Sequence, residues 1–343
     1  MKRCACLKAM VLMGCCLWIA LGVVIPQGAE AKTVTLTYSN FFPPTHIQSQ
    51  LAEQWCQEVE KRTEGRVRIK YFAGGTLTPA NQTYGGVLDG ISDIGMSAFA
   101  YTRGRFPVMA IVDMPLGYPT GVAATAVANA VQAKFQPEEL ANTQVMYLHA
   151  HGPGIIHTRG KPVRTLEDLK GVTIRSTGFS AEMVKALGAT PVAQPMPEAY
   201  QSLQKGVVDG SAHPIEANQG WKLGEVVHHA TMAYSVGYTT AFFVVINKDK
   251  WNSLEARDRE TIEAINAQWA VKHGEAWDSS DTEGLRAFFQ QGNSAFGLDS
   301  REAARWEAAV APMIDAYGQK LEDDGHNGKA ILKAIRETLK NHR

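Results

Sequence analysis

A repeated pattern constrains the fold of this chain more than any other feature of its sequence. The segments YGGVLDGISD, at residues 84–93, and YQSLQKGVVD, at residues 200–209, both match Tyr-x-x-(Val/Leu)-x-x-Gly-x-x-Asp in the same register. Tyr and Val or Leu, three residues apart, share one face of a helix. Gly90 and Gly206 provide the left-handed residue that commonly ends a helix, and the aspartate opens the return to a strand. The repeat predicts two lobes of similar architecture.

Strand and helix patterns alternate around the first copy of the repeat. Residues 33–38 alternate as in a strand, and apolar residues recur at three-to-four spacing over residues 46–63, as in an amphipathic helix. Further strands are expected at residues 67–72 and 94–98. This order predicts an α/β fold with largely parallel sheets.

The second half of the chain predicts another strand and several helices. Residues 240–247, TAFFVVIN, read as a fully buried strand. Ser253 is a plausible N-cap for a helix over residues 253–275, and further helical patterns cover residues 278–291, 300–320 and 328–340.

No low-complexity linker separates the two copies, so we expect several close crossings between the lobes, as in a hinge. The predicted N-terminal lobe comprises residues 32–152 plus 241–280. The predicted C-terminal lobe comprises residues 153–240 plus 281–343.

The N-terminus resembles a secretory signal peptide. Three basic residues precede an uncharged apolar run at residues 9–25, and Ala29-Glu30-Ala31 matches an A-x-A cleavage pattern. We predict cleavage after Ala31; an uncleaved membrane anchor is the alternative. Four of the five cysteines lie in this segment. Cys56, on the apolar stripe of a predicted helix, is then a buried thiol without an intrachain disulfide partner.

Composition and motifs exclude several classes of function. The 343 residues carry no net formal charge and no Lys/Arg block, so nothing predicts binding to nucleic acid or an anionic membrane. The sequence contains no G-x-S-x-G, P-loop or H-E-x-x-H motif. His149 and His151 would share one face of a strand, as a metal pair or as hydrogen-bonded histidines, but no spaced third ligand is evident. We therefore predict that the protein is not an enzyme and has no cofactor or metal.

Arg175 is a permanent cation where a short predicted strand meets a helix that begins near Ser180. Charged residues avoid buried positions unless they are paired. A guanidinium at a strand end of an α/β layer points to the region where such folds bind ligands, and its planar fork matches a carboxylate. Ser176-Thr177-Gly178 and the helix N-terminus add donors for an anion. Ligand binding and a structural ion pair are both open interpretations of Arg175.

Several longer segments resemble one family. The stretch GKPVRTLEDLKGVTIRSTG, at residues 160–178, is similar to the hallmark of DctP-type solute-binding proteins of tripartite ATP-independent periplasmic (TRAP) transporters. Further similar segments are LAEQWCQEVEKRTEGRVRIKYFAGGTL, GISDIGMSA, PEAYQSLQKGVVDGSAHP and FFVVINKDKWNSL. They cover nearly the whole chain after the predicted cleavage site, in order.

The resemblance implies a fold, a location and a function. The fold would be a two-lobe periplasmic binding protein of type II-like architecture, with hinge strands and a long helix crossing between the lobes. The mature periplasmic protein would not span the membrane. It would capture a small organic acid between its lobes, close, and deliver the acid to membrane-embedded transporter subunits. Arg175 matches the family's arginine that forms the carboxylate salt bridge.

Two departures from the family pattern bear on the ligand. Many members carry another arginine where this chain has Ile155, and many have Asn where this chain has His213, with Glu216 close behind. These changes favour a monocarboxylate with an apolar, aromatic or amine-bearing remainder. Glu216 would meet a ligand ammonium or pair with a lysine of its lobe.

The candidate site consists of charged residues and of side chains near predicted strand ends. The predicted ligand-binding residues are Arg175, His213, Glu216, Phe41, Ser97, Phe99, Tyr101, Met196 and Trp221. Aromatic residues at strand ends also belong to cores, so each wall residue has both interpretations. Two alternatives to transport are a binding protein that feeds a sensor and a periplasmic enzyme that uses His149, His151 or His213.

Overall fold

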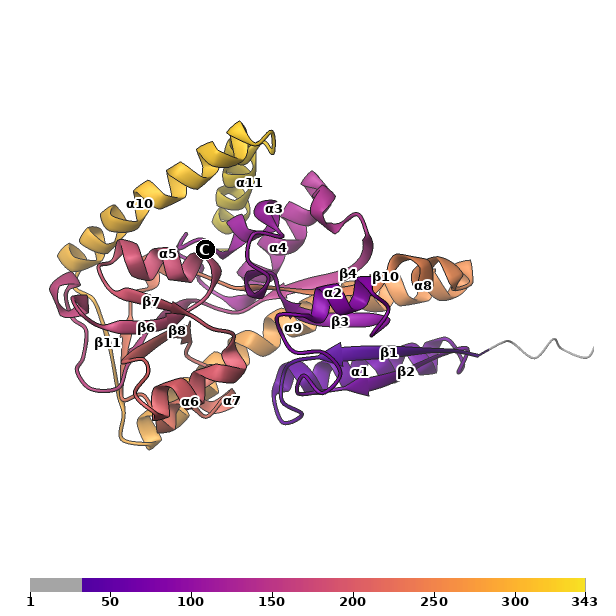
Figure 1. Cartoon of the computed structure of the whole chain (residues 1–343), viewed down its shortest axis with the longest axis horizontal. Helices are drawn as coiled ribbons and strands as arrows, with labels where there is room; N and C mark the ends of the chain where they lie inside the picture. The colour runs from indigo at the N-terminus through magenta and orange to yellow at the C-terminus, as the bar shows by residue number, and fades with distance from the viewer. Residues whose placement is uncertain (1–32, 343) are drawn as a thin grey trace, which may run out of the picture. The chain divides into compact units, whose positions relative to one another are not determined.

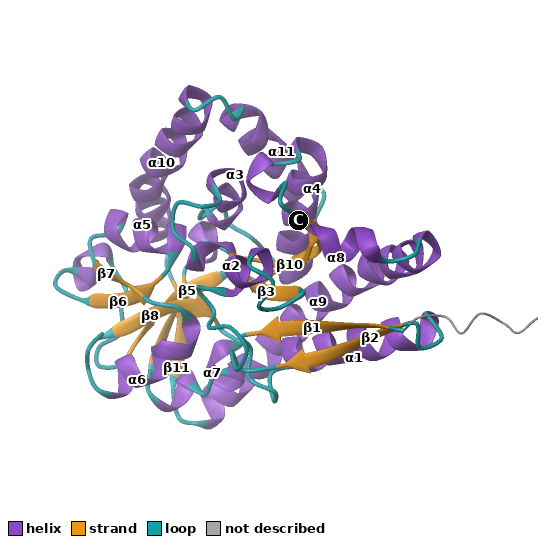
Figure 2. Ribbon diagram, turned by 45° about the vertical axis from the view of Figure 1, so that its right-hand side comes forward, coloured by secondary structure: helices purple, strands orange, loops and turns teal. Residues whose placement is uncertain are grey.

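The computed structural model describes residues 33–342 (Figure 1). The predicted signal peptide lies outside the described residues, so its cleavage stays a prediction. Within the described chain, two mixed sheets are flanked by helices, which confirms the predicted two-lobe α/β class (Figure 2). Among residues 33–342, no helix combines the length and the apolar character needed to cross a membrane.

The first sheet has the strand order β2-β1-β3-β10-β4. β1 pairs in parallel with β2 and β3, whereas β10 runs antiparallel to β3 and β4. Helices α1 and α2 connect the three parallel strands. The elements are β1 (Val34–Asn40), α1 (Ile47–Arg62), β2 (Val67–Phe72), α2 (Thr83–Leu88), β3 (Ile94–Ala98), α3 (Pro107–Ala110), α4 (Gly121–Phe135), β4 (Thr143–Ala150) and β10 (Ala241–Asn247).

The second sheet has the strand order β11-β9-β5-β8-β6-β7. β6 pairs in parallel with β7 and β8, and β5 runs antiparallel to β8 and β9. Its elements are β5 (Gly154–Thr158), β6 (Thr173–Ser176), α5 (Gly178–Ala186), β7 (Thr190–Ala193), α6 (Ala199–Gln204), β8 (Gly210–Pro214), α7 (Ala217–Gly220), β9 (His229–Met232) and β11 (Ser294–Gly297).

The sequence repeat corresponds to a repeated topology. β1-α1-β2-α2-β3 and β6-α5-β7-α6-β8 follow the same course, and their strand orders are β2-β1-β3 and β7-β6-β8. Gly90 and Gly206 each have φ of 72°, which confirms the predicted left-handed helix ends. Asp93 accepts hydrogen bonds from the backbone N–H and hydroxyl of Thr37, and Asp209 does the same for Thr173 in the second copy.

The expectation of largely parallel sheets holds in part: five of the nine strand pairings within residues 33–342 are parallel, but β10 and β5 run antiparallel to both of their neighbours. These are the strands that the chain forms directly after passing from β4 of the first sheet to β5 and from β9 of the second sheet to β10. These two passages lie near the predicted lobe boundaries, which stay a prediction.

The helices after β10 differ from the prediction in one respect. α8 (Lys248–Ser253) ends at the residue expected to begin the long helix, and α9 runs without a break over 35 residues, Ala256–Gln290. The predicted Ser253 N-cap and the break before residue 278 were therefore wrong. Trp269, Trp277 and Phe288 are buried along α9. The helix therefore packs against the rest of the protein on both sides of the expected break.

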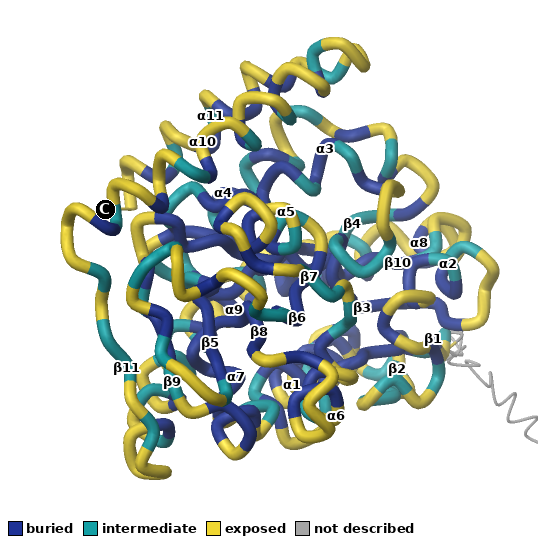
Figure 3. The backbone as a smooth tube through the Cα atoms, turned by 60° about the vertical axis from the view of Figure 1, so that its left-hand side comes forward, coloured by how far each residue is buried: buried dark blue, intermediate teal, exposed yellow. Residues whose placement is uncertain are grey.

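α9 contacts α1, α4 and β4 of the first lobe and α7 of the second, as expected for a helix that crosses between the lobes. α10 (Ser300–Asp323) packs on α5, and α11 (Gly328–Lys340) packs on α4. Figure 3 shows the central strands buried and the exposed positions gathered along the outer helices. Cys56 is free and buried, as predicted.

Candidate ligand-binding site

A cavity of about 20 Å³ lies where strands of both sheets end. β1 brings Phe41 and Phe42, β10 brings Phe242, and α9 brings Trp277 from the first lobe. β6 and β8 bring polar side chains from the second. The lining residues are Phe41, Phe42, Tyr101, His151, Arg175, Thr177, Met196, His213, Pro214, Glu216, Trp221, Tyr238, Thr240, Phe242 and Trp277.

Arg175 is 2% exposed and has no acidic partner. Its Nε donates to the carbonyl of Gln194 at 2.9 Å, and Nη1 donates to the carbonyl of Ala212 at 3.2 Å. Nη2 is buried without a hydrogen-bond partner. Two neutral carbonyls do not neutralise a buried cation, which requires an anion nearby. The structural ion pair weighed for Arg175 is not formed with any carboxylate of residues 33–342.

Most of the predicted site residues lie together. Seven of the nine line the cavity: Phe41, Tyr101, Arg175, Met196, His213, Glu216 and Trp221. Ser97 and Phe99 do not. The Ser97 hydroxyl donates to the carbonyl of Ala80 at 2.6 Å, and Phe99 packs edge-on against Phe106 in the core, with ring centroids 5.0 Å apart. The prediction of a binding role has no support from the structure at these two positions.

Aromatic rings form one wall of the cavity. Phe41 stacks on Trp221 at 16°, with centroids 6.1 Å apart, and so joins β1 to the segment that follows α7. Phe242 stacks on Trp277 with centroids 5.5 Å apart. Such a wall offers flat apolar surface to the part of a ligand that lies away from Arg175.

Two polar contacts join the lobes beside the cavity. Nε2 of His46, just before α1, lies 3.2 Å from Oε2 of Glu216, at an ion-pair distance but without hydrogen-bond geometry. Nδ1 of His46 accepts the N–H of Gln48. The Tyr101 hydroxyl accepts the N–H of Met196 at 3.2 Å. The described partner of Glu216 is thus a histidine, rather than the lysine considered from the sequence.

Two buried histidines stack face to face beside Arg175. His213 stacks on His157 with centroids 3.7 Å apart and an interplanar angle of 8°. Burial lowers the pKa of His157 to about 3. Burial, with a smaller contribution from His157, also lowers the pKa of His213 well below its usual value, although the hydrogen bond to Asn218 acts in the opposite direction. Both rings are therefore neutral near pH 7.

His149 and His151 have separate surroundings. Nδ1 of His149 accepts the indole N–H of Trp277 at 3.1 Å, and its ring stacks on His273. His151 lines the cavity, and its Nδ1 lies 2.6 Å from the carbonyl of Gly152. Within residues 33–342 no group of three His, Cys, Asp or Glu is placed to hold a metal ion. The two histidines are hydrogen-bonded, but not to each other.

Sequence reasoning missed several cavity residues, and most had a usable signal. His151 and Phe242 follow or begin strands next to the predicted cleft, so the strand-end argument used for Phe41 also applied to them. Trp277 had no such signal, because it lies in the middle of α9. Ile155 is buried in an apolar cluster with Met196 and Leu203 and does not line the cavity.

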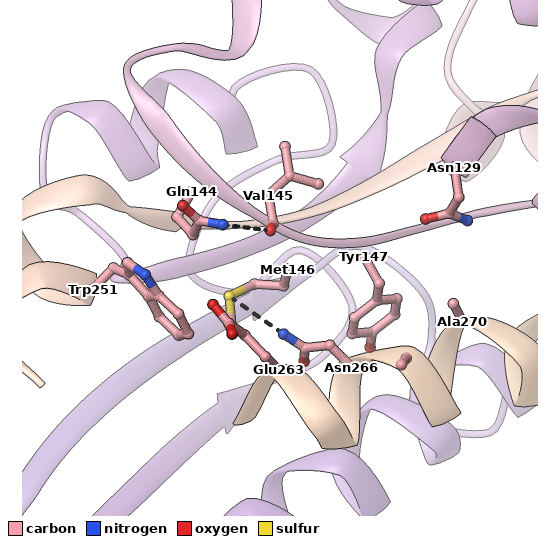
Figure 4. A pocket seen from close by; sticks show the side chains of 10 residues that line it. Asn129, Gln144, Val145, Met146, Tyr147, Trp251, Glu263, Asn266 and Ala270 are labelled. Carbon is pink, nitrogen blue, oxygen red and sulfur yellow. Dashed lines mark hydrogen bonds between the residues drawn. The ribbon is translucent and has the colours of Figure 1, made fainter. Parts of the chain in front are cut away.

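A second hollow, of about 210 Å³, lies between edge strand β4 and α9 (Figure 4). The register of β4 against β10 shifts at this point. Asn129 covers the strand edge, since its amide bonds both the carbonyl and the N–H of Leu148. Asn266 directs its amide nitrogen at the sulfur of Met146, 3.9 Å away. No buried charge without a partner lines this hollow, in contrast to the Arg175 cavity.

The fold and the first cavity define a class of protein: a two-lobe binding protein with a polar and aromatic site between its lobes. Residues 38–320 match the family model of DctP, "Bacterial extracellular solute-binding protein, family 7". The chain belongs to this family, whose members include the periplasmic solute-binding proteins of TRAP transporters.

Individual relatives agree with this assignment. The chain is 26% identical, over 93% of its length and 95% of the relative, to the ectoine/5-hydroxyectoine-binding periplasmic protein UehA of Ruegeria pomeroyi. A TRAP solute-binding protein from Rhodoferax ferrireducens, solved with copurified benzoate, superposes with a TM-score of 0.85 at 28% identity, covering 90% of this chain and 98% of that one. A TRAP periplasmic protein from Bordetella bronchiseptica with bound (R)- and (S)-mandelate gives a TM-score of 0.84 at 29% identity, covering 90% and 100%.

Proposed function

We propose that this protein is the periplasmic receptor of a TRAP transporter for a small monocarboxylate. Arg175 would bind the carboxylate, the lobes would close around the ligand, and the closed protein would deliver it to membrane-embedded subunits. The family supports the transport role. The relatives solved with benzoate and mandelate support an aromatic acid as the ligand class.

The single observation that carries this proposal is the buried Arg175 guanidinium with a free Nη2 and no acidic partner. A carboxylate matches its charge and its fork, and the low dielectric of a closed site strengthens the pair. The aromatic wall supports one carboxylate joined to an apolar or aromatic remainder, because Arg175 is the only cation that lines the described cavity.

The size of the cavity supports a coupling between capture and closure. A cavity of roughly 150 Å³ accommodates benzene, whereas the one described here measures about 20 Å³. A ring-sized acid therefore requires the lobes to separate or the lining side chains to move. Because the ligand would touch both lobes, its binding energy would favour the closed arrangement.

Native mass spectrometry of the mature protein, followed by calorimetry with the copurified acid or a panel of monocarboxylates, tests the proposal. Arg175→Ala should weaken binding by roughly 2–5 kcal/mol, because it removes one partner of a buried charged pair. Arg175→Lys keeps the charge but loses the fork, so it should also weaken binding, by a smaller amount.

Arg336→Lys is the matched control, since Arg336 is exposed on α11. It should bind like the wild type. A copurified ligand without a carboxylate, or unchanged affinity in Arg175→Ala, would contradict the role of Arg175.

A further inference from the structure

The cavity offers polar atoms that a plain carboxylic acid does not satisfy. Nη2 of Arg175 and Nδ1 of His213 are both buried without a hydrogen-bond partner, and both residues line the cavity. An ionised carboxylate only accepts hydrogen bonds, so it suits Arg175. Whether it also suits His213 depends on which imidazole nitrogen carries the proton.

Asn218 determines the tautomer of His213. Nε2 of His213 faces the amide oxygen of Asn218 at 3.4 Å, while the amide nitrogen of Asn218 faces Nε2 of His157 at 3.0 Å. An amide oxygen only accepts, so Nε2 of His213 carries the proton. Because the buried ring is neutral, its Nδ1 keeps a lone pair and acts as an acceptor.

His151 adds a second acceptor by an independent route. Its Nδ1 lies 2.6 Å from the carbonyl of Gly152, which only accepts, so Nδ1 carries the proton. Burial lowers the pKa of His151 to about 4, which keeps this ring neutral as well, and leaves Nε2 as an acceptor. Glu216, a further acceptor in the lining, already has Nε2 of His46 3.2 Å from its carboxylate.

We propose that the ligand carries a hydroxyl or N–H donor in addition to its carboxylate, and that Nδ1 of His213 accepts this donor. Asn218 and His157 are positioning residues that hold His213 in the acceptor tautomer. The inference rests on the proposed function, because Arg175 must first bind the carboxylate. A site with a buried acceptor discriminates against an acid that lacks the matching donor, since that acid leaves the acceptor unpaired.

Calorimetry with two series of three probes tests the proposal on the wild-type protein. Phenylacetate, mandelate and O-methylmandelate share a ring and a carboxylate, but only mandelate has a hydroxyl donor. Benzoate, 3-hydroxybenzoate and 3-methoxybenzoate place the donor elsewhere. In at least one series the hydroxy acid should bind about tenfold or more tighter than both other members. Equal affinities within both series would overturn the proposal.

His213→Phe tests the acceptor itself. This variant keeps an aromatic ring against His157 but removes Nδ1, so the preference for the hydroxy acid should fall to within about twofold, while the parent acid still binds. His228→Phe makes the same substitution at an exposed histidine and should keep the wild-type preference. A preference that persists in His213→Phe would overturn the proposal.

NMR of the wild-type protein with ¹⁵N-labelled histidine reports the tautomer without any substitution. The proton of His213 should be on Nε2, and a proton on Nδ1 would overturn the proposal even if His213→Phe failed to fold. Asn218→Leu should release the tautomer and reduce the preference for the hydroxy acid.

The experiments distinguish failure of this inference from failure of the proposed function. If the parent acids bind through Arg175 without any hydroxyl preference, the proposed function stands and this inference falls. If no acid of either series binds, both fall.

Discussion

Arg175 is a charge that the described protein buries without neutralising. Removing a charged group from water costs several kcal/mol unless a counter-ion and hydrogen bonds replace the lost hydration. The carbonyls of Gln194 and Ala212 replace part of that hydration, and no counter-ion does. A binding site that holds its charge ready for a ligand trades some stability of the free protein for affinity.

This trade predicts the effect of Arg175→Met on the ligand-free protein. A methionine of similar length removes the buried charge, so the free energy of unfolding should stay the same or rise by about 1 kcal/mol. Urea unfolding measures this free energy, once bound ligand has been removed by unfolding and refolding the protein.

Arg66→Met is the contrasting variant. Arg66 pairs with the carboxylate of Asp258 at 2.9 Å, so its loss leaves Asp258 without its cation and should destabilise the protein. If Arg175→Met were destabilised to the same extent, Arg175 would have a structural role instead.

At the residue scale, the sequence predicted which side chains meet but not how they are bonded. Arg175, His213 and Glu216 share one cavity because strand ends of a layered fold converge, which is a consequence of topology. The contact between His46 and Glu216 joins residues far apart in sequence, and no local pattern encodes it. Ser97 and Phe99 lie near a strand end, as Phe41 does, yet local packing directs their side chains away from the cavity.

At the scale of elements, strands were easier to predict than long helices. β2 and β3 have the predicted bounds, because short alternating or apolar runs between turns leave little choice of register. α9 was predicted as two helices, because the pattern does not reveal that its burial surface changes from one lobe to the other along its length.

Gly284 marks the place where α9 meets the segment that carries Glu216. A Cβ at Gly284 would lie 2.6 Å from Cα of Glu216 and from the carbonyl oxygen of Ile215. Gly284→Ala gains helix propensity, worth up to about 1 kcal/mol, but must displace this backbone. We expect a net loss of about 1–3 kcal/mol in the free energy of unfolding, together with weaker ligand binding.

Gly85→Ala, in α2, is the control that shows the effect of helix propensity without a steric contact. No atom lies within 4 Å of the Cβ that this substitution adds, so the variant should be as stable as the wild type or more stable. Thermal unfolding of both variants compares them. A stabilised Gly284→Ala with normal affinity would show that the segment at Glu216 moves freely.

At the scale of the whole molecule, the repeated pattern predicted the two similar lobes, and the structure adds how they are joined. The passages from β4 to β5 and from β9 to β10 lie against each other and against α9, since Gly154 pairs with Tyr238 and Trp277 packs on His151. The pairing direction of β5 and β10 depends on these crossings, and neither strand has a local signal for it. This is why the repeat could be read from the sequence while the mixed character of the sheets could not.

The buried histidines make stability depend on pH across the whole molecule. Burial lowers the pKa of His149, His151, His157, His213 and His273. The unfolded chain binds protons at these sites below about pH 6.5 while the folded protein does not, so acid favours unfolding. Burial raises the pKa of Asp113 and Asp281 well above the usual value, and it also raises the pKa of Glu139 and Asp278. These acids act in the opposite direction, because the folded protein holds their protons.

Five histidines oppose four acids, but only Asp113 and Asp281 are raised well above the usual value. We therefore expect the free energy of unfolding to fall by a few kcal/mol between pH 7 and pH 5. Urea unfolding at several pH values measures the slope. Asp113→Asn removes one opposing group while keeping an oxygen that can accept the N–H of Ala241, as Asp113 does at 2.8 Å. This variant should therefore gain stability relative to the wild type at pH 7 and lose that gain toward pH 5, which steepens the slope. Stability that stays constant or rises toward pH 5 would contradict this balance: either the buried acids outweigh the histidines, or the histidines take up protons in the folded protein.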